Sequence, residues 1–331
     1  MSLIRLPALV AAVLLAGCAA TPPVIDRRVP LAIEPACRRE EIKPGVYALR
    51  IAVRDYVPID GAGPRLRLVG AIHIADRHFY SDIQAVLDRS DCVLFEGVSE
   101  SPDDFKRDPA TRRKDHLYTK MADALGLITQ FEGVDYRREH FVNADLSPRQ
   151  MMALLEADIA KGGAEAEAAR AAKAQFGDLT KMMKGGGSGM TGVMMNLMLG
   201  FIERSPKVRA TVLLTLASVD TTGEQGFGAM GKGGARLGRL ILEDRNAAVL
   251  AAIRGKVGEL GPDQTVAVFY GAAHLRGIED SLIRELGYVP DSTRWLTAFE
   301  VDAGAADFMA LARTDTCPLA AVRHRTLPVF G

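Results

Sequence analysis

The sequence has no excess of charge of either sign and no block of basic residues. Its 331 residues include 41 lysines and arginines against 41 aspartates and glutamates. Proteins that bind nucleic acid concentrate cations to neutralise phosphates, so this balance predicts that nucleic acid is not a partner. Apolar residues, by contrast, make up 48% of the chain, which is enough for one large core or for a core with a helical insertion.

Long apolar runs are also missing. The segment Leu6–Ala16 is too short to span a bilayer, and so is the methionine-rich segment MTGVMMNLMLGFIER. Because Leu6–Ala16 follows the single cation Arg5 and leads into small residues, it is typical of the apolar part of an export signal. We therefore expect an exported protein.

The residues that end this signal resemble a bacterial lipobox. In the Leu-Ala-Gly-Cys of residues 15–18, Cys18 would be lipidated and become the mature N-terminus. Residues 1–17 are then the signal peptide, and Ala19 fits an outer-membrane destination. We predict a bacterial cell-envelope protein that a lipid anchor on Cys18 holds at the outer membrane. The protein would face the periplasm. An ordinary cleaved signal peptide with an incidental cysteine is the alternative.

Cysteines are few, and none has a second cysteine or a histidine nearby at the spacing of a metal site. Cys92 lies in the apolar segment DCVLFE, where a thiol behaves as a small hydrophobe. Cys37 and Cys317 lie near the two ends of the chain, and an oxidising periplasm would permit a disulfide between them. Two unpaired thiols are the alternative, because the sequence does not place their Cα atoms.

Apolar runs separated by helical patterns predict an α/β fold. A proline-rich tether over residues 18–44 leads into a single domain over residues 45–331. There GVYALRIAV, RLRLVGAIHIA, DCVLFEGV and TVAVFYGAAH read as strands, and a helix with Phe79 and Ile83 on its apolar face follows the second. We expect a central mixed or mainly parallel sheet of about four to six strands. A largely helical insertion covers about residues 147–256, with ATVLLTLASV as its one candidate strand.

Two of the predicted strands end in the pattern Gly-x-x-His. Gly70 precedes His73, and Gly271 precedes His274, while Glu96 ends a third strand. Glycine is common here, so the spacing alone is weak evidence, but ligands of open α/β sheets gather beyond the carboxyl ends of the strands. The glycines would let the chain turn tightly and leave space beside each imidazole. The pattern predicts a site made by His73, Glu96 and His274; imidazoles that bond only to backbone are the alternative.

Two longer segments carry a resemblance to a known family. GAIHIADRHFYSDIQAVLDRSDCVLFEGV and VAVFYGAAHLRGIEDSLIRELGYVP resemble the two signature regions of the TraB/GumN family, which is similar to the TIKI proteases and more distantly to the EreA/ChaN-like proteins. FVNADLSPRQ and LEDRNAAVLAAI resemble its intermediate blocks, so the resemblance covers roughly residues 45–290. The sequence departs from the family at Ala71, where Thr is common, and at Arg276, where Pro is common.

This resemblance implies a metal-dependent hydrolase of the protease type. Its ligands would be His73, His274 and Glu96, which suit a divalent cation such as Mn²⁺, Co²⁺ or Zn²⁺ with an open position for an acidic bound water. In a second arrangement Glu96 is the general base and Asp145, in the segment NADLSP, completes the ligand set.

The resemblance also singles out Arg245, which matches a helix arginine of the family. Arg245 would hold a substrate carboxylate or stabilise an oxyanion; a surface salt bridge with Glu243 or Asp244 is the alternative. Asp76 either orients His73 or caps the helix that follows. For the remaining histidines we expect solvated or satisfied rings: His78, His116, His140 and His324.

Two functional classes follow from these patterns. The first is an exported hydrolase with a peptide or small-molecule substrate. The second is a non-catalytic lipoprotein of the same fold that binds haem or a peptide, since ChaN-like relatives are associated with haem. A metal analysis and a haem titration would separate the two classes.

Overall fold

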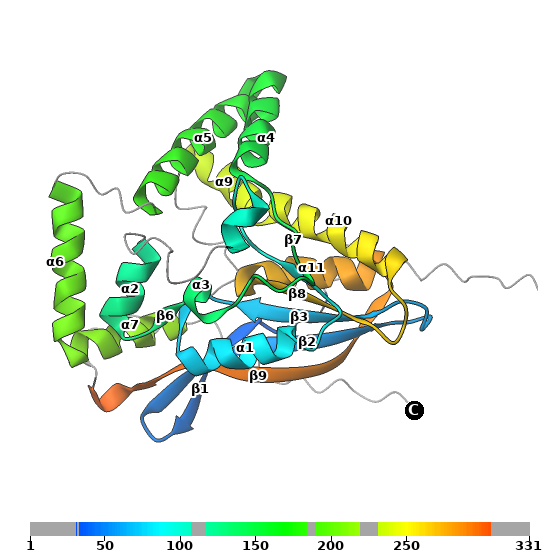
Figure 1. The fold of residues 1–331 in the computed structure, drawn as a ribbon. Coiled ribbons are helices and arrows are strands. Elements are labelled where there is room, and N and C mark those ends of the chain that lie inside the picture. The colour runs from blue at the N-terminus through cyan, green and yellow to red at the C-terminus, as the bar shows by residue number, and fades with distance from the viewer. Residues whose placement is uncertain (1–30, 32, 107–116, 184–189, 219–230, 306–331) are drawn as a thin grey trace, which may run out of the picture.

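The computed structural model describes residues 31, 33–106, 117–183, 190–218 and 231–305. Its centre is a seven-stranded mixed sheet with helices on both faces (Figure 1), which confirms the α/β prediction but has more strands than the four to six that we expected. A separate two-stranded sheet joins β4 (Ile74–Ala75) to β6 (Ile128–Thr129).

The main sheet has an antiparallel half and a parallel half. Its strands are β1 (Cys37–Lys43), β2 (Val46–Pro58), β3 (Arg65–Ala71), β8 (Thr265–Gly271), β5 (Cys92–Phe95) and β7 (Phe141–Asn143) in spatial order, with β9 (Tyr288–Asp302) beside β2. β1, β3 and β9 pair with β2 in antiparallel register. β8 pairs in parallel with both β3 and β5, and β7 is parallel to β5. The carboxyl ends of four neighbouring strands therefore share one edge of the sheet.

Alternation along the central strands divides the core into two layers. In β8, Ala267 and Phe269 face one hydrophobic cluster, whereas Val266, Val268 and Tyr270 face the other. Successive side chains of a strand point to opposite faces, and strands covered on both faces are apolar throughout. One layer includes α1 (Arg77–Leu87) and the other includes α10 (Glu243–Glu259) and α11 (Ala272–Glu285).

The helices that follow β3 and β8 bury the faces that their sequences predict. In α1 the buried side chains include Phe79, Ile83 and Val86. In α11 they include Ile278 and Leu282. Apolar residues three and four positions apart form one face of a helix, and that face packs on the sheet.

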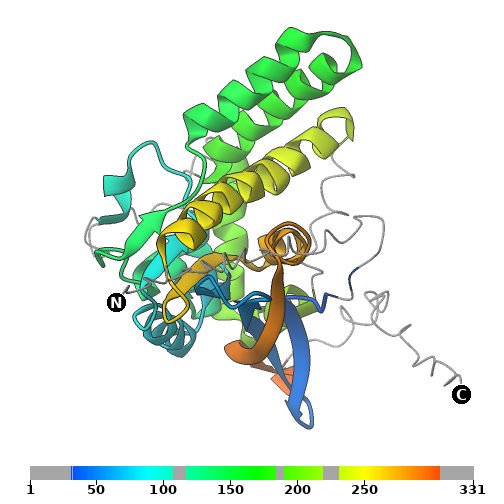
Figure 2. The same cartoon turned by 90° about the vertical axis from the view of Figure 1, so that its right-hand side faces the viewer.

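Between β7 and β8, every regular element in the described residues is helical. These elements are α4 (Pro148–Lys161), α5 (Gly163–Met183), α6 (Met190–Arg204), α7 (Pro206–Ser218), η3 (Gly231–Gly233), α9 (Gly234–Ile241) and α10. Ser147 begins α4 with a capping box to Gln150, and Pro148 occupies its first turn. Figure 2 shows α4 and α5 as a hairpin that projects away from the sheet.

The prediction of a strand at ATVLLTLASV is wrong. Residues 210–218 of this segment lie in α7, where Ala210, Leu213, Leu214 and Ala217 are buried. Those positions repeat at helical spacing, and the helical period overrides the strand preference of the β-branched residues between them.

The remaining helical elements are short: α2 (Leu117–Leu125), α3 (Gln130–Gly133), η1 (Pro102–Lys106) and η4 (Ala303–Ala305). Of the helices in the described ranges, none is both long and apolar enough to cross a bilayer.

The sheet begins earlier in the chain than expected. β1 starts at Cys37, within the segment 18–44 that we predicted as a tether, so the last part of that segment belongs to the sheet. Its sequence CRREEIK is too charged to resemble a strand, but within the described ranges β1 is an edge strand that pairs only with β2 and leaves most of its side chains accessible. Cys92 is buried in β5, where burial raises the pKa of its thiol.

Several predictions concern residues outside the described ranges. They are the signal peptide 1–17, the lipid site Cys18, the disulfide partner Cys317, and the histidines His116 and His324.

Candidate functional site

The three predicted site residues lie beyond the carboxyl ends of three adjacent parallel strands. His73 follows β3, His274 follows β8 and Glu96 follows β5, and β8 lies between the other two strands. Some two hundred residues separate the two histidines along the chain, but the parallel order of the strands brings them to one edge of the sheet.

Arg245, on α10, reaches this edge and joins two carboxylates. Its Nη2 donates to Glu96 Oε1 at 2.5 Å and to Asp145 Oδ2 at 2.6 Å. Its Nε donates to Asp145 Oδ1 at 2.9 Å. The alternative of a surface salt bridge with Glu243 or Asp244 is therefore wrong, because Arg245 is buried and its ion-pair partners are Glu96 and Asp145.

Asp145 holds the arginine and is not free to act as a metal ligand. Its side chain is fully buried. Besides the two bonds from Arg245, its oxygens accept hydrogen bonds from the backbone N–H groups of Gly97 at 3.0 Å and Leu146 at 2.8 Å. Four donors saturate this carboxylate, so the arrangement with Asp145 as a ligand is not supported.

Glu96 and Arg245 are both charged. Burial alone would raise the pKa of Glu96, but the Arg245 guanidinium, the two histidines and the N–H of Gly271 together lower it to about 2. Burial alone would lower the pKa of Arg245, but the charges of Glu96 and Asp145 raise it above its usual value. The site therefore contains a buried ion pair that persists across the physiological pH range.

Gly271 lies against both Glu96 and His274, whereas Gly70 lies against β2. The N–H of Gly271 donates to Glu96 Oε2 at 2.5 Å, and a Cβ at this position would lie 3.0 Å from that oxygen and 3.5 Å from His274 Cδ2. At Gly70 a Cβ would meet Ile51 Cγ2 at 2.6 Å. The absent side chain of Gly70 therefore makes room for β2 and not for an imidazole, so that part of the prediction is wrong.

His274 is a buried neutral imidazole in a fixed orientation. Its Nδ1 lies 2.8 Å from Asn246 Oδ1, and Asn246 Nδ2 donates to the carbonyl of His274 at 3.3 Å. Because that carbonyl can only accept, the amide nitrogen of Asn246 must face it and the amide oxygen must face Nδ1. Nδ1 then carries the proton and Nε2 has the lone pair. Burial lowers the pKa of His274, which keeps this form neutral.

The lone pair of His274 faces the ion pair. Nε2 lies 3.6 Å from Glu96 Oε1 and 3.5 Å from Arg245 Nη1. His274 is not at the strand end itself but in the first turn of α11. Its ring also packs edge-on against Tyr270, with centroids 5.5 Å apart.

His73 is the exposed member of the set. It lies in the loop between β3 and β4, and its carbonyl accepts a hydrogen bond from the N–H of Gln130 at 2.9 Å. Its ring stacks on Tyr118, with centroids 4.4 Å apart and planes 36° from parallel. His73 as a residue is exposed, yet enough protein surrounds the imidazole for desolvation to lower its pKa, and the charges of Glu96 and Arg245 act on it in opposite directions.

The geometry fits two ligands of the predicted metal site better than three. Glu96 Oε1 and His274 Nε2 are 3.6 Å apart, close to the separation of two ligands that each lie about 2.1 Å from one ion. However, Arg245 already contacts that oxygen. In the described part of the chain, no group of three or more His, Cys, Asp or Glu side chains is arranged to hold a metal ion. Among the described residues, Glu96 Oε1 and His274 Nε2 are therefore the two predicted donors shown to lie close together, with the guanidinium beside them.

Other predicted residues have minor roles. His78 is exposed on α1, and His140 Nε2 lies 3.4 Å from the carbonyl of Leu87, so neither belongs to the site. Asp76 occupies the N-cap position of α1, as one of its two predicted roles requires, but its side chain makes no capping hydrogen bond.

Two residues of this site were not predicted. Asn246 directly follows Arg245 in the segment LEDRNAAVLAAI, and that adjacency is the only signal that could have indicated it. Tyr118, which stacks on His73, lies in a polar segment without a recognisable pattern.

Comparison with known proteins found no matching family model, no matching curated protein and no matching solved structure.

Proposed function

We propose that this protein is an exported hydrolase of peptide or related carbonyl substrates, as the TraB/GumN resemblance implies, and that His73 meets the substrate. One observation carries the proposal. An accessible neutral imidazole lies at the carboxyl ends of adjacent parallel strands, in the field of a buried ion pair and a second neutral imidazole. Ligands of open α/β sheets gather at this edge, and perturbed titratable groups there favour catalysis over a purely structural role.

His73 has the protonation state of a general base. Its lowered pKa leaves a ring nitrogen free to accept a proton at neutral pH. As water attacks the substrate carbonyl, the carbon–oxygen bond forms and the water proton passes to His73. The same proton then passes to the leaving amine as the carbon–nitrogen bond breaks.

The positive charge of Arg245 is held in a fixed position by buried side chains. The developing oxyanion would be stabilised by the field of Arg245, whose charge already acts on His73. Asp145 and Glu96 hold the guanidinium from two sides, and His274 Nε2 accepts from its Nη1. These groups need no rearrangement during the reaction, which is the condition under which electrostatic stabilisation is most effective.

The predicted divalent cation remains part of the proposal as a cofactor to be tested. Glu96 Oε1 and His274 Nε2 are the donors that would hold it, but none of the steps above requires it. The predicted location is also part of the proposal. The export signal and the lipobox-like Cys18 support a lipid-anchored protein at the outer membrane, facing the periplasm.

The test compares two exposed histidines. We expect His73→Ala to abolish hydrolysis of a fluorogenic peptide library without changing the melting temperature, because an accessible ring contributes little to the core. His78→Ala is the matched control, since His78 is exposed on the helix that follows, and it should retain activity. Retained hydrolysis in His73→Ala would overturn the proposal.

A metal and a haem arm separate the remaining alternatives. Each variant is assayed after chelation and again after addition of Mn²⁺, Co²⁺ or Zn²⁺, so a requirement for metal appears as restored activity. Haem is then added to the protein without substrate. An intense visible absorption band that His73→Ala removes, in a protein without hydrolytic activity, would favour the binding protein over the hydrolase.

A further inference from the structure

Helix α6 has apolar side chains on two opposite sides. The inner side packs against the core through Met195, Leu199 and Ile202, and contacts α2 and α7. Among the described residues, the outer side has no such cover, and each of its five large apolar residues is between 52% and 66% exposed: Val193, Met194, Leu197, Met198 and Phe201. Their spacing puts them on one continuous face. A helix with apolar residues on two opposite sides is often covered on both, so this outer face is a candidate contact surface.

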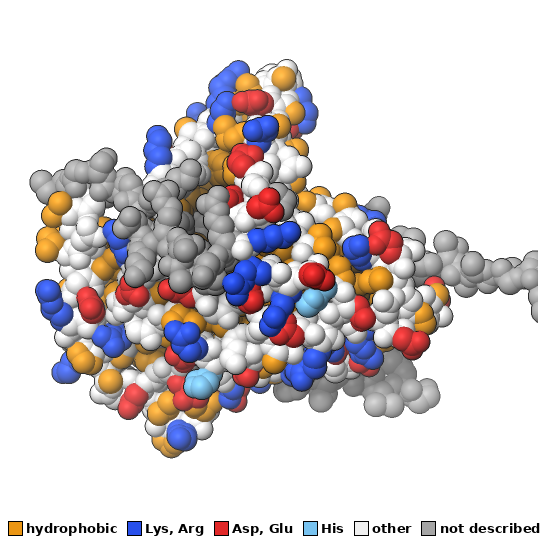
Figure 3. All heavy atoms as spheres, viewed as in Figure 1, with side chains coloured by type: hydrophobic (Ala, Val, Ile, Leu, Met, Phe, Trp, Pro, Cys, Tyr) orange, Lys and Arg blue, Asp and Glu red, His pale blue; other side chains and the backbone are white. Residues whose placement is uncertain are grey.

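The charges near this face are arranged asymmetrically. No charged residue precedes Glu203 in the sequence of α6. Arg204 lies three residues after Phe201, on the same side as the outer face, and the exposed Lys207 follows in α7. Figure 3 shows hydrophobic side chains at the edge of the molecule where α6 lies, with cations close by. Apolar side chains bordered by Arg and Lys fit the boundary between acyl chains and anionic headgroups.

The dimensions of the face do not favour two other uses. A helix of 15 residues is about 22 Å long, and a strip about 10 Å wide along it covers on the order of 200 Å². A stable interface between two protein copies needs about 800 Å² from each partner. Fifteen residues are also too few to span a bilayer. The face therefore suits a helix that lies along a lipid surface.

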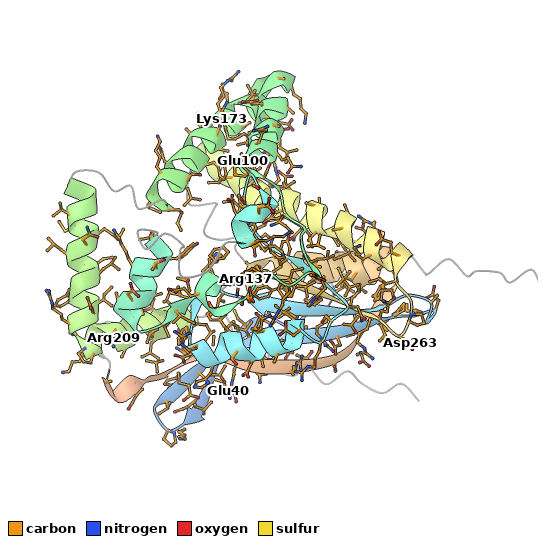
Figure 4. The ribbon with its side chains drawn as sticks, in the orientation of Figure 1. Glu40, Glu100, Arg137, Lys173, Arg209 and Asp263 are labelled. Atoms are coloured by element: carbon orange, nitrogen blue, oxygen red, sulfur yellow. The ribbon has the colours of Figure 1, made fainter. Side chains whose placement is uncertain are left out.

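The end of α6 is fixed to the body of the protein. Arg209, on α7, donates through Nη2 to the carbonyl of Glu203 at 2.6 Å, and Figure 4 shows Arg209 at the junction of α6 and α7. The buried residues Leu199 and Ile202 add contacts on the inner side. The outer face is thus presented on a helix that is packed along its other side.

We propose that α6 is an in-plane membrane helix, whose outer face inserts into the surface of a lipid bilayer. Its attachment is separate from the predicted lipid on Cys18, because the exposed face and its cations would bind lipid with or without that anchor. The anchor would keep the chain near the bilayer, and α6 would fix which side of the protein faces the lipid.

The experiment uses the full chain with one tryptophan at a chosen position. The single native tryptophan, Trp295, is first replaced by phenylalanine. Tryptophan is then introduced at Leu197 on the outer face or, as a control, at Ile59, which is 56% exposed in the turn between β2 and β3. Both proteins are mixed with vesicles of phosphatidylethanolamine and phosphatidylglycerol, with and without brominated acyl chains.

The proposal predicts a blue shift and strong bromine quenching for Leu197→Trp, and neither effect for Ile59→Trp. Equal quenching at the two positions, or none at Leu197→Trp, would overturn it. A blue-shifted spectrum of Leu197→Trp before vesicles are added would also overturn it, because another protein surface would then already cover the face. Chains carrying Cys18→Ser should give the same contrast, which separates this surface from the anchor.

Discussion

Replacing Glu96 with glutamine should remove a pH-dependent part of the free energy of unfolding. A carboxyl whose pKa is lowered from 4.5 to about 2 in the folded state contributes about 3 kcal/mol of stability at neutral pH. The pKa is lowered on folding, so this contribution is complete above the unfolded value near 4.5 and is lost as the pH falls toward 2. Glu96→Gln should therefore cost about 3 kcal/mol at pH 7 and progressively less below pH 4.5.

Urea unfolding of the two proteins between pH 7 and pH 3, followed by circular dichroism, measures this difference. Glu100→Gln is the control, because Glu100 is half exposed and its ion pair with Arg149 is long, at 3.9 Å; glutamine keeps an oxygen that can accept the 3.0 Å hydrogen bond from the Arg149 N–H. Exposed pairs of this kind contribute at most about 1 kcal/mol. If Glu96→Gln and the native protein lose stability in parallel below pH 4.5, Glu96 is not held ionised by Arg245 and the description of the buried ion pair is incorrect.

Three further changes test neighbouring features. Asn246→Ala should remove the hydrogen bond that keeps the proton of His274 on Nδ1, so that both tautomers of the ring are populated. Nitrogen NMR of the ring would show this mixture, and an unchanged spectrum would contradict the assigned orientation. Gly271→Ala should weaken the backbone bond to Glu96, because the new Cβ would lie 3.0 Å from Oε2, and should raise the pKa of Glu96 in a carboxyl NMR titration; an unchanged titration curve would count against it. Cys18→Ser should release most of the protein from the membrane fraction at high salt, and an unchanged distribution would argue against the lipobox.

The parallel part of the sheet could be predicted because its strands differ clearly from their surroundings. Segments such as TVAVFYG are apolar throughout and are followed by amphipathic helices, so both the strand and the direction of the chain after it are encoded locally. β1 could not be predicted in this way. Its stability depends on pairing with β2, and nothing in CRREEIK indicates that partner.

The same distinction separates the parts of the site. The positions of His73, Glu96 and His274 follow from the ends of predicted strands. The bonds of Arg245 do not, because its partners Asp145 and Glu96 precede it by 100 and 149 residues. Local patterns identify which side chains reach an edge of the sheet, but only the packing of α10 over that edge decides which of them pair.

The two Gly-x-x-His segments share a sequence pattern but differ in structure. After β8 the chain enters α11 at once, and His274 is fixed by Asn246 with its lone pair toward Glu96 and Arg245. After β3 the chain first forms the short strand β4, which leaves His73 in a loop with an accessible ring. A buried imidazole with a fixed tautomer is suited to support a charge network, whereas an accessible imidazole is suited to exchange protons with a substrate. The repeat in the sequence therefore corresponds to two different environments, and under the proposed function these environments would give the two histidines different roles.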